Sequence, residues 1–158
     1  MLAKREFLLS LGGFETDDRV YRGSEDKSLW IEVAASPRPL LLLGKVTVQY
    51  RVHGQSMSHN GLRQLASSQA VLKRAQMRHG ERLQRADWNR TWAFSYYQAA
   101  IIYHDAGRFR EAAGFLLKSL WLSPVLRHPT ISNRYGTFFR CKRLVQTARK
   151  WMLAKASA

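Results

Sequence analysis

Residues 11–30 read LGGFETDDRVYRGSEDKSLW, and this stretch sets the expected structure of the first third of the chain. Gly12 and Gly13 can adopt the left-handed backbone that often ends a helix, so they terminate a short helix expected over residues 3–11. Phe14 follows them and is expected to fold back as an anchor of the core. The polar residues after Phe14 contain few apolar side chains, which predicts a loop.

A second helix is expected over residues 24–35. Ser24 is placed to cap its N-terminus, and Glu25 and Asp26 lie in the first turn, where the helix dipole favours negative charge. The residues expected on its buried stripe are Leu29, Trp30 and Val33. Taken alone, Glu25 and Asp26 are ordinary first-turn carboxylates.

A strand is predicted over residues 40–53, with a possible turn at Gly44-Lys45, because apolar and polar side chains alternate over residues 46–53. One face of this strand is apolar, and the other places Arg51 and His53 side by side. Taken alone, a histidine at a strand end is most simply satisfied by a backbone carbonyl. A strand among helices predicts an α+β fold class for the chain.

Four pieces of this region stand in an order that resembles the acceptor-side half of a family 2 glycosyltransferase with a GT-A fold. They are Leu11-Gly12-Gly13-Phe14-Glu15, Glu25-Asp26, Leu29-Trp30 and Tyr50-Arg51-Val52-His53. In that family a Gly-Gly-Phe turn leads into a loop, an acidic pair opens a helix that runs on to Leu-Trp, and a strand ends in Tyr-Arg-x-His. The resemblance covers residues 1–60, and the half of the family's catalytic domain that binds the nucleotide sugar is not in this chain.

The resemblance implies an inverting transfer of a sugar from a nucleotide-sugar donor to an acceptor hydroxyl on a glycan or a lipid-linked sugar. Asp26 matches the carboxylate that takes the proton from this hydroxyl, and Glu25 would be a neighbouring acceptor or orienting group. His53 matches a position near the metal and the diphosphate, and Arg51 lies beside it. A divalent metal, Mn²⁺ or Mg²⁺, would neutralise the diphosphate as the bond to the sugar breaks. The residues implied as structural are Gly12, Gly13 and Trp30.

The Asp-x-Asp metal ligands of that family are missing, since Asp17 and Asp18 are adjacent rather than spaced and lie elsewhere in the pattern. The resemblance therefore implies that this chain alone binds no metal and is inactive without a donor-binding half. We expect a truncated or split protein, with Met1 as a start codon inside a longer ancestral frame. Whether the chain acts as an enzyme is left open.

The remainder of the chain reads as helix. A long helix is expected over residues 60–85, with a break at Gly80. Residues 92–126 then match the spacing of one tetratricopeptide repeat, with Gly107 in the turn and Pro124 ending the second helix. The match rests on Tyr96, Ala100, Tyr103, Gly107, Phe109, Ala112, Leu120, Leu122 and Pro124. One such hairpin must pack on further helices, because repeat arrays generally need about three units.

A last helix is expected over residues 133–156. Its apolar stripe is expected to be buried and consists of Phe138, Cys141, Val145, Ala148 and Met152, widened by Leu144 and Trp151. The rest of the helix is basic. Such a helix either caps the repeat with a wet polar face, which we favour, or lies on an anionic membrane surface.

The chain has a formal net charge of +15 that is unevenly distributed. Residues 1–60 hold 8 Lys and Arg against 7 Asp and Glu, whereas residues 61–158 hold 18 against 4. The second part thus favours anionic partners: nucleic acid, acidic lipid headgroups or an acidic protein face. We expect no specific nucleic-acid binding, because no base-reading module is present. The single cysteine, Cys141, excludes an internal disulfide and fits a cytoplasmic location, with peripheral membrane contact as an alternative.

Together these features predict three regions: a partial glycosyltransferase acceptor-side unit over residues 1–60, a linking helix over 61–90, and a helical tail over 91–158. Two functions remain open. One is a fragment or split part of an inverting glycosyltransferase, and the other is a non-enzymatic helical module that binds a protein partner through its tail and basic surface.

Overall fold

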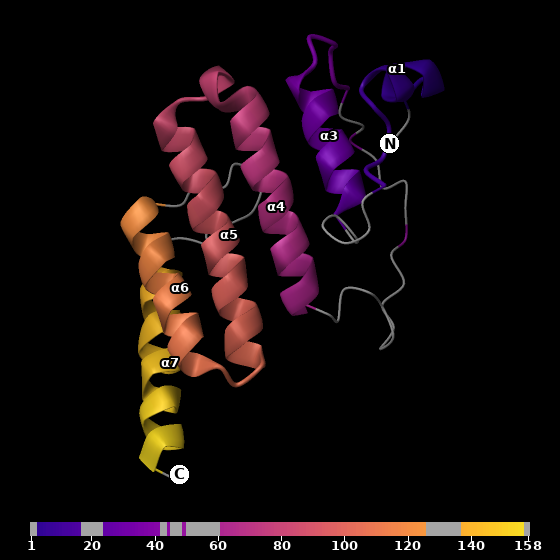
Figure 1. The fold of residues 1–158 in the computed structure, drawn as a ribbon. Coiled ribbons are helices and arrows are strands. Elements are labelled where there is room, and N and C mark those ends of the chain that lie inside the picture. The colour runs from indigo at the N-terminus through magenta and orange to yellow at the C-terminus, as the bar shows by residue number, and fades with distance from the viewer. Residues whose placement is uncertain are drawn as a thin grey trace. The chain divides into compact units, whose positions relative to one another are not determined.

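A computed structural model of the chain describes residues 3–16, 24–41, 44, 49, 61–125 and 137–156. Every regular element in these ranges is a helix (Figure 1). The predicted α+β class is therefore wrong, and the described chain is all-α. Of the strand predicted over residues 40–53, only Leu40, Leu41, Gly44 and Gln49 are described, and none of these lies in a strand. A strand needs a partner strand to pair its backbone groups, and the described residues supply none.

The chain divides into two compact units, Met1–His79 and Gly80–Ala158, which we describe separately. The first unit contains helix α1 (Arg5–Ser10), helix α3 (Glu25–Ala35) and helix α4 (Gly61–His79). Helices α3 and α4 contact each other, and the Lys27 ammonium donates a hydrogen bond of 2.5 Å to Ser68 Oγ of α4. The buried apolar side chains of this unit are Leu29, Val33, Leu65, Val71, Leu72 and Ala75.

The helices predicted over residues 3–11 and 24–35 are confirmed near their expected bounds as α1 and α3. Helix α3 buries Leu29 and Val33 as expected, while Trp30 is half-buried. Ser24 occupies the N-cap position, but its side chain makes no capping hydrogen bond. Helix α4 stops at His79 and is followed by a 3₁₀ turn, Gly80–Arg82, so the break expected at Gly80 is present. The long helix predicted to run to residue 85 therefore ends earlier.

The second unit is a helical hairpin joined to a third helix. Helix α5 (Arg85–Asp105) and helix α6 (Phe109–Leu122) form the hairpin, and helix α7 (Thr137–Ala156) packs on it. Gly107 makes the turn with a φ of +74°. Its N–H bonds to His104 O at 3.0 Å and the Arg108 N–H bonds to Tyr103 O at 2.9 Å, which together form a Schellman cap. Pro124 lies just after the end of α6, as predicted.

Small side chains line the contact between α5 and α6. Ala93, Ala100 and Ala112 are essentially inaccessible to solvent, so the two backbones approach closely. Ser119 is equally buried, and its hydroxyl donates a hydrogen bond of 2.7 Å to Ala93 O. Tyr97 and Leu116 complete this core, against which Leu144 of α7 packs.

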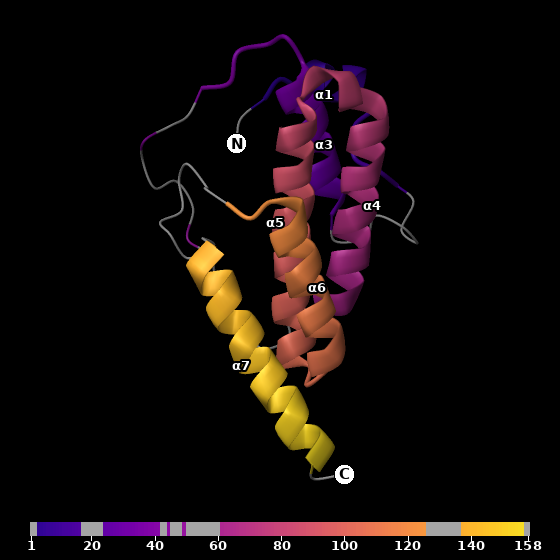
Figure 2. The same ribbon diagram turned by 90° about the vertical axis from the view of Figure 1, so that its left-hand side faces the viewer.

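Helix α7 buries a different face from the one that its apolar stripe predicts. Phe138, Val145 and Met152 are 74%, 69% and 64% exposed, and Cys141 is exposed as well. The buried positions are instead Arg140 and Thr147, both at 0%. Figure 2 shows α7, in yellow, at the edge of this unit beside α6.

Arg140 explains this orientation. Its guanidinium donates hydrogen bonds to Ser119 O (2.9 Å), Ser119 Oγ (3.0 Å), Ser123 O (2.8 Å) and Pro124 O (2.7 Å). These oxygens lie at or just beyond the end of α6, where the helix dipole favours a cation, and Ser119 O also accepts a bond of 3.2 Å from the Ser123 N–H. Making these bonds places Arg140 against α6, so that the apolar stripe of α7 faces outward. None of the described helices combines the length and the apolar content that crossing a membrane requires.

Candidate functional site

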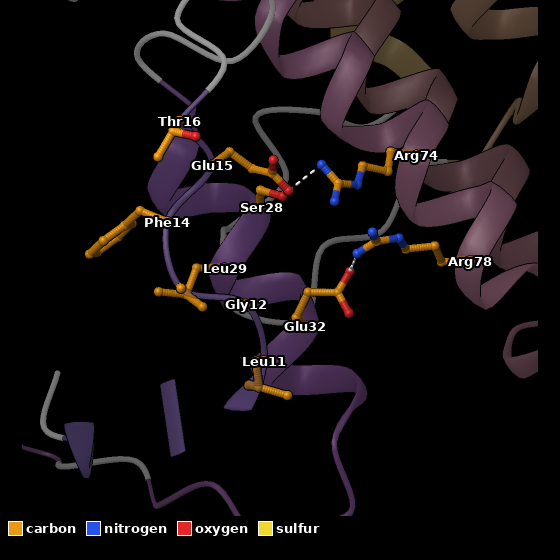
Figure 3. Close-up of a pocket in the computed structure, with 11 residues that line it drawn as sticks. Leu11, Gly12, Phe14, Glu15, Thr16, Ser28, Leu29, Glu32, Arg74 and Arg78 are labelled. Atoms are coloured by element: carbon orange, nitrogen blue, oxygen red, sulfur yellow. Dashed lines mark hydrogen bonds and ion pairs between the residues drawn. The ribbon is translucent and has the colours of Figure 1, made fainter. Parts of the chain in front are cut away.

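A pocket of about 260 Å³ opens in the first unit (Figure 3). Its lining comes from the turn after α1 (residues 11–16), from α3 (Ser28, Leu29 and Glu32) and from α4 (Arg74 and Arg78). This volume is slightly below the roughly 300–1,000 Å³ that is typical of pockets for drug-sized ligands. It suits one small polar molecule.

The Gly-Gly turn shapes one wall of the pocket. Gly12 and Gly13 have φ angles of +94° and +67°, and their N–H groups bond to Leu9 O and Leu8 O, both at 3.0 Å. These are the two bonds of a Schellman cap, so the predicted helix stop is confirmed. The chain then turns so that Phe14 and Glu15 line the pocket. Phe14 is 55% exposed, and its predicted role as a core anchor is wrong, because the turn leaves it at the surface.

Two carboxylates and two guanidiniums supply the charge of the pocket. Arg74 forms an ion pair with Glu15. Arg78 Nη1 donates to Glu32 Oε1 at 3.2 Å, and His79 Nε2 donates to Glu32 Oε2 at 3.1 Å. Figure 3 shows both Arg–Glu pairs reaching across from α4, so the lining is electrically balanced and its oxygens are held in place.

The predicted catalytic pair lies at the start of α3, beyond the pocket lining. Asp26 is exposed, and its Oδ1 accepts a hydrogen bond of 2.6 Å from the Lys27 backbone N–H. Glu25 is half-buried and precedes Ser28, Leu29 and Glu32 by three, four and seven residues. It therefore shares the helix face that lines the pocket, whereas Asp26 lies to the side of that face.

The predicted metal and diphosphate residues, His53 and Arg51, lie outside the described residues, as do Asp17 and Asp18. Within the ranges that the structure covers, no three His, Cys, Asp or Glu side chains gather as a metal site. The charged side chains that line the pocket, Glu15, Glu32, Arg74 and Arg78, can recognise a polar ligand.

The charged lining residues were not identified from the sequence. The sequence predicts a loop at Glu15, and its patterns assign no role to Glu32, Arg74 or Arg78. A signal was present, because Arg74 and Arg78 are four residues apart and must share one face of α4. What the sequence could not show is that Glu15 and Glu32 would meet that face.

A second polar cluster lies in the other unit, around His104. This imidazole is 6% exposed, and its Nδ1 lies 2.9 Å from Thr147 Oγ1. The Thr147 hydroxyl donates to Arg143 O at 2.8 Å, so it accepts from Nδ1–H, and Nε2 is left to accept from Lys150 Nζ at 3.3 Å. Burial lowers the pKa of His104, and the charges of Lys150 and Arg143 lower it further. These hydrogen bonds join α5 to α7, and we interpret the role of the cluster as structural.

Comparison of the chain with family models, with characterised proteins and with solved structures gives no match.

Proposed function

We propose that the chain is the acceptor-side part of an inverting family 2 glycosyltransferase, and that the pocket of the first unit binds the acceptor sugar. One observation carries this proposal. The Gly-Gly-Phe turn and the helix that opens with Glu25-Asp26, which are separate pieces of the resemblance, contribute to the lining of one pocket or to the helix face that lines it (Figure 3).

The chemistry of the lining supports a neutral, hydroxyl-rich ligand. Glu15 and Glu32 accept hydrogen bonds from hydroxyl groups, and Arg74 and Arg78 donate them. Because the two carboxylates balance the two guanidiniums, the pocket favours an uncharged sugar over a diphosphate. Phe14 adds an exposed apolar surface at the rim for the apolar face of a sugar ring.

In this proposal the nucleotide-sugar donor is held by another chain. The acceptor hydroxyl loses its proton to a carboxylate of the Glu25-Asp26 pair, its oxygen attacks the anomeric carbon, and the nucleoside diphosphate leaves. Asp26 is the base by resemblance, and Glu25 is the member of the pair on the pocket face. The isolated chain binds the acceptor without turning it over.

Acceptor binding is tested by ligand-observed NMR with a panel of methyl glycosides and the full chain. We expect weak binding of at least one glycoside, and Glu32→Gln should weaken it roughly tenfold or more, because hydrogen bonds to a charged group contribute about 1.5–3 kcal/mol. Glu81→Gln, an exposed change in the other unit, is the matched control and should leave binding unchanged. Failure of every glycoside to bind, or equal losses in both variants, would contradict the acceptor site.

Calorimetry with UDP and GDP sugars, with and without Mn²⁺, tests the location of the donor site. We expect no binding to the isolated chain. Metal-dependent binding that disappears in an Asp26→Asn, His53→Ala double variant would instead place a donor site in this chain.

The alternative of a helical interaction module needs a surface other than the side of the hairpin that α7 covers. Leu144 packs on the core of α5 and α6, and Arg140 and Thr147 bond to the same two helices. A partner seated there would have to displace α7. The outer face of α7 is exposed and stays accessible to a partner.

A further inference from the structure

Helix α7 presents an apolar row on its outer side. Phe138, Val145 and Met152 are spaced seven residues apart and are each more than half exposed. At a rise of about 1.5 Å per residue the row extends for roughly 21 Å along one face. It is a ridge on a single helix, held outward by the bonds that Arg140 makes to the end of α6.

Cations run beside this ridge. Lys142 and Arg149 lie four residues after Phe138 and Val145, so each is one turn from an apolar side chain and on the adjoining strip of the helix. Both are exposed, and within the part of the chain that the structure describes neither forms an ion pair. No aspartate or glutamate follows Glu111 anywhere in the sequence.

From this pattern we infer that the outer face of α7 docks on an anionic lipid surface, with Phe138, Val145 and Met152 below the headgroups and Lys142 and Arg149 against the phosphates. An apolar helix face flanked by basic side chains can enter the boundary between headgroups and acyl chains. The long Lys and Arg stems let their charges remain at the headgroup level. Helix α7 need not leave the unit, because the face that packs on α5 and α6 is the opposite one.

The positive charge of α7 favours an anionic lipid surface over a second copy of the chain as the partner of this face. Two α7 helices packed through their ridges would bring Lys142 and Arg149 of both copies together with no acidic side chain on either helix to balance them. An anionic bilayer removes this repulsion, and each basic residue near such a surface adds about a fivefold gain in binding. This inference uses other residues than the sugar pocket and does not depend on the proposed function.

Vesicle sedimentation with the full chain tests the inference. We expect binding to phosphatidylcholine vesicles that contain about one third phosphatidylglycerol, weak binding to phosphatidylcholine alone, and a loss of binding as salt shortens the Debye length from about 10 Å toward 3 Å. A Val145→Asn, Met152→Gln double variant should bind the anionic vesicles at least about tenfold more weakly, because it removes the buried apolar contact. The matched control is Met77→Gln with Val125→Asn, which makes the same chemical changes at exposed positions outside α7.

A second pair of variants tests whether Lys142 and Arg149 themselves attract the lipid surface, or whether the net charge of the whole chain does. Lys142→Gln with Arg149→Gln should lower binding to anionic vesicles about thirtyfold, whereas Lys73→Gln with Arg85→Gln should change it little. Circular dichroism checks that each variant retains its helices. Equal losses in the α7 and control pairs, no binding to anionic vesicles, or equal binding to neutral ones would overturn the inference. So would a dimer in sedimentation velocity that Val145→Asn, Met152→Gln dissociates, since a second copy would then cover the ridge.

Discussion

Gly107 and Gly114 lie in the same hairpin, but an added side chain is expected to affect stability in opposite directions at the two positions. Gly107 has a φ of +74°, a conformation that costs an L-residue roughly 1–2 kcal/mol. Gly114 lies inside α6, where glycine is less favourable than alanine by about 0.5–1 kcal/mol. A Cβ added at either position meets no atom within 4 Å, so packing does not obscure the comparison.

We therefore expect the two alanine substitutions to have opposite signs. Gly107→Ala should lower the free energy of unfolding by about 1–2 kcal/mol, and Gly114→Ala should raise it by about 0.5–1 kcal/mol. Urea unfolding followed by tryptophan fluorescence measures both, because Trp88, Trp92, Trp121 and Trp151 all lie in this unit. A Gly107→Ala variant as stable as the unchanged chain, or more stable, would contradict the left-handed turn, and a destabilised Gly114→Ala variant would contradict the helix-propensity argument.

His104 makes the stability of the second unit depend on pH. Its pKa in the folded chain lies below the value of about 6.5 expected in the unfolded chain, because the site is buried and faces Lys150 and Arg143, opposed only weakly by Asp105. As the pH falls below about 6.5, the unfolded chain therefore takes up a proton that the folded chain does not. Stability should be full above this pH and decrease as the pH falls toward the folded pKa.

Urea midpoints at neutral and mildly acidic pH measure this effect. His104→Asn keeps an N–H donor for Thr147 but cannot titrate, so its midpoint should change less between the two conditions than that of the unchanged chain. The same pH dependence in both proteins would assign the effect to another group.

At the scale of the element, α7 shows polar contacts determining which face of a helix is buried. Its apolar stripe would ordinarily face the core. Arg140 instead faces α6 and donates to four oxygens at or just beyond the end of that helix, with bonds of 2.7–3.0 Å. Thr147 lies seven residues after Arg140, on the same face of α7, and adds a hydrogen bond to His104. Only Leu144 then contributes a large apolar contact to the core cluster from this helix.

We expect Arg140→Met to destabilise the second unit by roughly 2–4 kcal/mol, since it removes the hydrogen bonds that the guanidinium donates to Ser119, Ser123 and Pro124. Lys142→Met, an exposed change on the same helix, should alter stability by no more than about 0.5 kcal/mol. Urea unfolding gives both values, and hydrogen exchange should show α7 amides losing protection in Arg140→Met before those of α5. Similar stabilities for the two variants would mean that Arg140 does not hold α7.

At the scale of the whole molecule, the net charge of the sequence changes near residue 60, whereas the compact units of the structure divide later in the chain. The compact units meet between His79 and Gly80, inside the region predicted as a linking helix over 61–90. The first unit balances its pocket charges in Arg–Glu pairs, whereas the second has no acidic residue after Glu111. The two proposals follow this division: a neutral sugar for the first unit and an anionic surface for the second.

The sequence by itself determined the features that depend on local backbone energy. Gly12, Gly13 and Gly107 marked helix ends because few other residues adopt positive φ, and the helices over α1, α3 and the hairpin followed from their apolar spacing. The α+β class was wrong because a strand exists only with a partner strand, which the alternation over residues 46–53 cannot supply, and the described residues contain no strand. Only the tertiary structure placed Glu15 and Glu32 against Arg74 and Arg78, and only it turned Arg140 inward. Both outcomes depend on contacts between residues far apart in the chain, which no local pattern records.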